Sequence, residues 1–236
     1  MTDTVRLQFC SSNRALALGQ HRAFVEGIKE KLFPAFDNIE EEADRLSDEA
    51  YQRLVEIHGN EDGPDIADIA ESAIDDGVVK FESLIFVKGQ LSGLAIAGTY
   101  HLWEKTLKAF FLRELSHHYM SAQRRRNVES ANYNTLAGWL GAMGVTLGQK
   151  AYREDLETCR LIANTIKHGD GPSCQKLAKH APNVLRGPYG DIFGFSEGNS
   201  DNLWIEPRSF EQLASSIEEF WRDLPDDMVV SASVFD

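Results

Sequence analysis

The feature that most constrains the fold is a long amphipathic stretch from Gln90 to Tyr119. At about 100° per residue, large apolar side chains gather on one side of a helix and polar groups on the other. The apolar side, which we expect to be buried, contains Ile96, Trp103, Leu107, Phe110 and Phe111. Glycines and alanines at 93, 95, 97 and 98 make the first half thin, which would let another helix approach closely. Such a helix must be covered by others, so we expect an all-α fold.

Helical patterns recur along the chain between turn residues. Pro34 interrupts the first pattern, and Gly77 is a potential break in the third. Two short apolar segments, residues 5–9 and 203–206, are expected to form a small peripheral strand pair. We expect an N-terminal helical region at 1–80 and a helical domain at 81–236, packed as one unit. The further helices are expected at 20–33, 37–59, 65–89, 133–145, 149–169, 172–181 and 209–224.

The formal net charge of −13 repels phosphate at long range and argues against a general nucleic-acid coat protein. A local basic site is still compatible with this charge. No apolar run reaches the roughly 18 residues of a membrane span, and the N-terminus lacks the layout of a signal peptide. We therefore expect a cytoplasmic protein with no membrane partner. Three cysteines without C-x-x-C spacing indicate reduced thiols.

A row of polar side chains occupies one face of the helix expected at 149–169. At about 100° per residue, the row lies within about 100° of arc, opposite an apolar back that includes Ile162 and Ile166. Asn164 is a modest helix former in mid-helix, where Gln or Glu would suit a solvated face better, so it indicates a functional amide. The row comprises Arg153, Glu157, Arg160, Asn164, Lys167 and His168.

An ion-pair network is the alternative interpretation of this face. Basic residues in the last turn before a capping glycine are favoured by the helix dipole, and Glu157 and Arg160 have ordinary i,i+3 spacing. The helix at 90–119 has its own polar side, on which His101 and Glu104 could ligate a metal. A second such pair is absent, so we expect no metal. Glu104 should instead meet a basic group, with Arg160 or Lys167 as candidates.

The run R-x3-N-x2-K-H-G at 160–169 resembles the HEPN superfamily (higher eukaryotes and prokaryotes nucleotide-binding), as do the flanking segments "YHLWEKTLKAFFLREL" and "FEQLASSIEEFWRDL". The resemblance covers about residues 90–223. It implies a HEPN-like helical bundle and frequent dimerisation. In many members it also implies a metal-independent endoribonuclease of toxin–antitoxin, abortive-infection or antiviral systems. Seven residues separate Arg160 from His168 here, more than the family signature usually has.

The chemistry of such a site follows from RNA itself, whose 2′-hydroxyl is a built-in nucleophile that needs no metal. His168 would exchange the protons, because an imidazole pKa lies near about 6.5. Arg160 would stabilise charge on phosphorus and Asn164 would orient the histidine or ribose. Lys167 and Arg153 would bind substrate. His101, Glu104 and Glu157 would support these groups, and no cofactor is expected.

The resemblance therefore implies an RNA-cleaving effector of a bacterial toxin–antitoxin or antiviral defence system, which we take as the expectation. One helix supplies few donors, so we expect a homodimer that completes the site. An antitoxin or another defence protein is a candidate partner. Two alternatives stay open: a non-catalytic HEPN-like module that binds a nucleotide, RNA or protein, and a structural protein. The basic run at 124–126 is either an RNA contact or a solvated loop.

Overall fold

The computed structural model describes residues 4–58, 63–117, 120–188 and 199–236. The fold is all-α with a small two-stranded sheet, as the sequence predicts. In the described part of the chain, no helix is both long and apolar enough to cross a membrane. The strands are β1 (Thr4–Gln8) and β2 (Asp227–Ser231). The helices are α1 (Ser11–Gly27), α2 (Ile39–His58), α3 (Ile66–Ser116), α4 (Ala122–Ser130), α5 (Tyr133–Ala142), α6 (Arg153–His168), α7 (Pro172–His180) and α8 (Pro207–Asp223).

The helix α3 spans 51 residues without interruption, so the prediction of two separate helices at 65–89 and 90–119 is wrong. The carboxylate of Asp65 caps its start by accepting a hydrogen bond from the backbone N–H of Ala67 at 3.1 Å. Gly77 does not break the helix. Its lack of a side chain lets α2 pack closely, because a Cβ there would lie 2.7 Å from Oγ of Ser47. The helix also runs through residue 80, where a boundary between two regions was expected.

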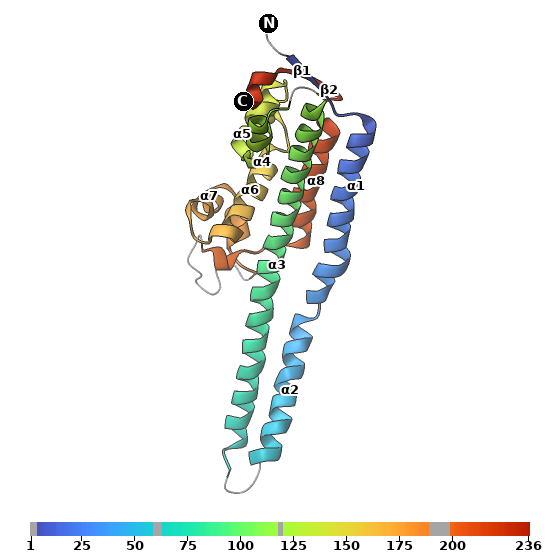
Figure 1. Ribbon diagram of the computed structural model, residues 1–236. Helices are drawn as coiled ribbons and strands as arrows, with labels where there is room; N and C mark the ends of the chain where they lie inside the picture. Colours follow the sequence, from blue (N-terminus) through green and yellow to red (C-terminus); the bar gives the residue numbers. More distant parts are fainter. Residues whose placement is uncertain (1–3, 59–62, 118–119, 189–198) are drawn as a thin grey trace.

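The connection from α1 to α2 changes helix type twice. A π-helical turn at Ile28–Leu32 leads into a 3-10 turn at Phe33–Phe36, and Pro34 lies in this second turn. Pro34 has no N–H to donate, which explains why a regular α-helix ends before it. Figure 1 shows α2 and the first half of α3 lying side by side and projecting beyond the rest of the bundle. We call α2 with residues 66–88 of α3 the arm.

The second half of α3 forms the centre of the core. Its predicted apolar side is buried, and Trp103 meets Phe220 of α8 edge to face with ring centroids 5.4 Å apart. The thin stretch is also confirmed: a Cβ on Gly93 would lie 2.9 Å from Cδ1 of Ile166, and one on Gly98 would lie 2.8 Å from Phe24 of α1. Because α6 lies so close to α3, the polar face of α6 comes next to the polar side of α3.

The sheet pairs the two ends of the chain. Strand β1 runs antiparallel to β2, with Val5 opposite Val230 and Leu7 opposite Met228. The predicted pairing of residues 5–9 with 203–206 is therefore wrong. Residues 203–206 form no strand; Leu203 is buried against α3, and the backbone N–H of Ile205 donates to Oγ of Ser92 at 3.1 Å.

Candidate functional site

The helix α6 is anchored by its back. Cys159 and Ile162 are fully buried, whereas Arg160 and Asn164 on the opposite side are only partly buried. The helix ends at Gly169, whose φ of 65° lies in the left-handed region that glycine adopts without strain. The sequence thus builds a helix with one apolar face and one polar face, and packing against α3 fixes which way the polar face points.

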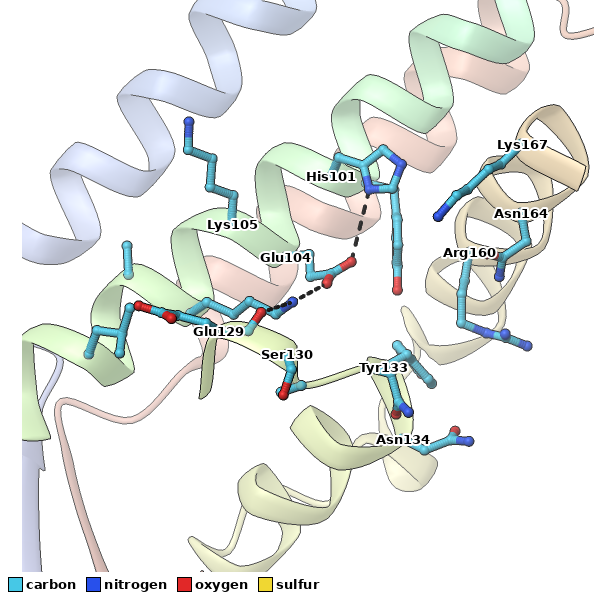
Figure 2. A pocket seen from close by; sticks show the side chains of 16 residues that line it. His101, Glu104, Lys105, Glu129, Ser130, Tyr133, Asn134, Arg160, Asn164 and Lys167 are labelled. Atoms are coloured by element: carbon cyan, nitrogen blue, oxygen red, sulfur yellow. Dashed lines mark hydrogen bonds and ion pairs between the residues drawn. The ribbon is translucent and has the colours of Figure 1, made fainter. Parts of the chain in front are cut away.

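Three residues of this polar face open on a basin of about 970 Å³ between α6, α3 and the α4–α5 connection. Arg160, Asn164 and Lys167 come from α6. Figure 2 shows Lys167 extending from α6 toward His101 on α3. The α3 wall carries Tyr100, His101, Glu104, Lys105 and Lys108, and the third wall is formed by residues 129–134.

The basin is locally positive in an otherwise acidic protein. Four of its side chains are cationic and two, Glu104 and Glu129, are carboxylates. Among the described residues, Lys167 has neither an ion pair nor a hydrogen bond to its side chain, and it is exposed. Lys105 is also exposed but points away from Glu104 and stands at the margin of the basin (Figure 2). The first turn of α5 adds partial positive charge at the third wall.

Arg160 is held in place by two neighbours. Its Nε and Nη2 donate to the two carboxylate oxygens of Glu157 at 2.8 and 2.5 Å. Its guanidinium carbon lies 5.5 Å from the centroid of the Tyr133 ring, within the range of a cation–π contact. The hydrogen bonds to Glu157 raise the pKa of Arg160 above its usual value. The i,i+3 ion pair is therefore present, and the same arginine also lines the basin.

Glu104 meets a basic group as expected, but neither of the predicted ones. Nζ of Lys108, one turn later on α3, donates to it at 2.5 Å, and Nδ1 of His101 lies 3.9 Å from its other oxygen. Lys108 reaches Glu104 because side chains four residues apart on one helix lie next to each other on the same face. Burial, helped by the charge of Glu104, raises the pKa of the neighbouring Tyr100 phenol well above its usual value.

Three predicted site residues, His168, Arg153 and Glu157, lie outside the basin. His168 is the last residue of α6 and is exposed, and it is absent from the lining. Arg153 stands at the start of α6 and pairs with Glu154 at 3.2 Å. Glu157 does not line the basin either, but it supports Arg160. The roles assigned to these residues from the sequence stay predictions.

The third wall was not found from the sequence. Asn132 caps α5 by accepting from the backbone N–H of Thr135 at 3.1 Å, and Tyr133 and Asn134 follow it at the rim. An Asn before an apolar run is a helix-start signal that could have been found; its place beside α6 could not. The basic run at 124–126 contributes nothing to the basin. Arg124 is buried and its Nε donates to Oδ1 of Asp236 at 2.6 Å.

In the described residues, no three His, Cys, Asp or Glu side chains gather as a metal site would require. No family model, curated protein or solved structure matches the chain.

Proposed function

We propose that this protein binds RNA by taking a short single-stranded segment into the basin. The observation that carries the proposal is that Arg160, Lys167 and Lys108 converge from two helices on one concave surface in a chain of net charge −13. Cations gathered in a concavity attract phosphate even when the rest of the surface repels it. Arginine and lysine donate charge-assisted hydrogen bonds to phosphate oxygens.

The polar, uncharged groups of the basin favour RNA over a simple phosphate ion. Single-stranded RNA is recognised through unstacked bases, which stack on aromatic or guanidinium planes and hydrogen-bond with amides. Tyr133 and Arg160 offer the planes, and Asn132, Asn134 and Asn164 offer amides. A volume of about 970 Å³ also exceeds what one phosphate needs.

The test is the binding of a fluorescein-labelled oligoribonucleotide of about 12 nucleotides, followed by anisotropy. We expect Lys167→Ala to weaken binding roughly three- to tenfold and to flatten its salt dependence. Lys179→Ala is the matched control, because it removes the same charge from an exposed site on α7 outside the basin. Equal losses in the two variants, or no RNA binding by the wild type, would contradict the proposal.

Metal-independent RNA cleavage is the second candidate function, and the position of His101 favours it. Its imidazole lies at the basin with a carboxylate 3.9 Å from Nδ1, an arrangement that could orient the ring. In such a reaction His101 would take the proton of the 2′-hydroxyl, whose attack on phosphorus forms a 2′,3′-cyclic phosphate and breaks the bond to the 5′-oxygen, which would take a proton from water. Arg160 and Lys167 would stabilise charge on phosphorus. The HEPN resemblance, the homodimer, the antitoxin partner and the defence role remain proposals that rest on the sequence alone.

A further inference from the structure

A stripe of apolar side chains runs along the part of α3 that lies in the arm. Ile74, Val78, Phe81 and Ile85 follow one another at spacings of four, three and four residues, which places them within about 60° of arc. The stripe is not the contact with α2, because that contact uses the neighbouring buried positions, among them Gly77. Ile74 is 59% exposed and Val78 is 47% exposed, whereas Phe81 and Ile85 are partly buried. A regularly spaced apolar stripe with exposed members is typical of a helix-docking seam.

The stripe continues into a groove of about 430 Å³ at the base of the arm. One wall is α3, where Phe86 is 51% exposed, and the other is the segment before α8. Trp204 of that segment is partly buried, and Lys88 lies 5.4 Å from its ring centroid. The end of a docked helix could bury its apolar side chains in this groove.

Apart from Lys88, which lies over Trp204, the charges beside the stripe and groove are acidic. Glu71, Asp75 and Glu82 lie along the flank of the stripe that is turned away from α2, and Asp201 joins Glu82 at the groove. Within the described residues, none of these four carboxylates forms an ion pair. Residues 39–58 and 66–88 together contain twelve acidic and four basic side chains. A ligand for this surface must therefore be apolar on one side and basic beside it.

We propose that the stripe and groove dock an amphipathic helix of a partner protein. The helix carries apolar residues at i, i+3 or i+4 and i+7, and Lys or Arg along the edge that meets Glu71, Asp75 and Glu82. The distance from Ile74 to Gly89 along α3 corresponds to about 23 Å, or about four helical turns. Charge decides against a second copy of this chain, because two arms would bring the same acidic flanks together.

The test uses the full chain and a synthetic amphipathic Leu/Lys peptide of about four turns. A Leu/Glu peptide of the same pattern and a scrambled Leu/Lys peptide serve as controls. Trp204 reports docking, because it lines the groove whereas Trp103, Trp139 and Trp221 are buried in the core. We expect a change of tryptophan emission with the Leu/Lys peptide only, and its loss in Trp204→Phe.

The matched variants separate apolar docking from general attraction to an acidic protein. The double variant Ile74→Gln, Val78→Gln keeps every charge and should weaken binding of the Leu/Lys peptide at least about tenfold. Val229→Gln changes a similarly exposed apolar residue on β2 and should leave binding within about twofold.

Equal binding of the Leu/Glu or scrambled peptide, or full binding by the double variant, would overturn the proposal. The proposal would also be overturned if sedimentation showed a wild-type dimer that becomes a monomer in the double variant, because the stripe would then bind a second copy of the chain. The basin is a separate surface, so RNA binding should be unchanged in the double variant.

Discussion

Arg160 is joined to Glu157 by two hydrogen bonds within one turn of α6, at 2.8 and 2.5 Å, while the same guanidinium lines the basin. Glu157 thus both positions the arginine and neutralises part of its charge. An incoming phosphate would compete with this carboxylate for the same donors. The ion pair and the binding role predicted for Arg160 are therefore coupled and can be separated by changing one partner.

Replacing Glu157 with Gln should tighten RNA binding roughly two- to fivefold at low salt, because it removes a negative charge beside Arg160. The gain should shrink as salt screens the charge. Glu154→Gln is the control, since it removes a carboxylate from the same helix at a 63% exposed position outside the basin. Anisotropy titrations at two salt concentrations measure the effect. If Arg160 serves only the ion pair, Glu157→Gln will not differ from Glu154→Gln.

For cleavage, the two candidate histidines predict different outcomes. His101 faces the basin, whereas His168 is exposed beyond it, so His101→Ala should lose more activity than His168→Ala. Loss of general acid–base help typically costs about 10²- to 10⁴-fold in rate. The measurement is cleavage of labelled RNA in chelator, with products tested for 2′,3′-cyclic phosphate ends. The reverse order would favour a site built on His168, which in this fold would have to be completed by a second subunit.

The local features of the fold could be predicted from sequence, and the non-local ones could not. The buried aromatic side of α3, the back of α6 and the end of α6 at Gly169 follow from helical spacing and cap chemistry. The partner of β1 does not, because residues 203–206 and Asp227–Ser231 are both short and apolar. Glycine shows the same limit: the sequence indicates a potential helix break at Gly77, but in the fold this glycine leaves room for Ser47 of α2.

The candidate site shows the same division. Helical spacing alone placed Arg160, Asn164 and Lys167 on one face and His101 and Glu104 on another. That these faces meet depends on how α6 packs on α3, where Gly93 leaves room for the side chains of Leu203 and Ile166. The third wall comes from residues 129–134, whose position is set by how α4 and α5 pack, so no pattern within that segment could reveal it.

Close packing around the glycines of α3 gives a stability prediction. A Cβ on Gly89 would lie 2.5 Å from the backbone oxygen of Leu203, which cannot move as a side-chain tip could. Gly89→Ala should therefore lower the free energy of unfolding by about 1–3 kcal/mol. Gly138 lies inside α5 with open space around it, so Gly138→Ala should raise the free energy of unfolding by about 0.5–1 kcal/mol. Urea unfolding measures both, and stabilisation by Gly89→Ala would show that α3 does not approach Leu203 so closely.

The last prediction concerns pH and a histidine outside the basin. His21 of α1 is 2% exposed, and its Nε2 lies 2.8 Å from the carbonyl oxygen of Ala214 on α8. Because a carbonyl oxygen only accepts, Nε2 carries a proton, and one proton on the ring suffices. Burial lowers the pKa of His21; the Ala214 hydrogen bond and the charge of Glu218 oppose this less strongly, and the charge of Arg22 adds a still smaller lowering.

The sign follows from which state binds the proton. In the unfolded chain His21 takes up a proton near pH 6.5, about its unperturbed pKa, whereas the folded protein keeps it neutral to lower pH. The unfolded state therefore binds more protons below about pH 6.5, and stability falls there by up to about 1.4 kcal/mol per pH unit. Above that pH the group contributes no slope. Carboxylates whose pKa is lowered in the fold, such as that of Asp223, also stabilise the protein, but this contribution is lost only at more acidic pH.

Thermal unfolding between pH 7.5 and 5.5 measures this slope. His21→Gln removes the titrating group while keeping an amide that can donate to Ala214, so it should flatten the decrease in Tm over this range even if its Tm at pH 7.5 is lower. His58→Gln is the control, because His58 is exposed at the end of α2 and its loss should leave the slope unchanged. If His21→Gln loses as much Tm on acidification as the wild type, the buried imidazole does not govern stability in this range.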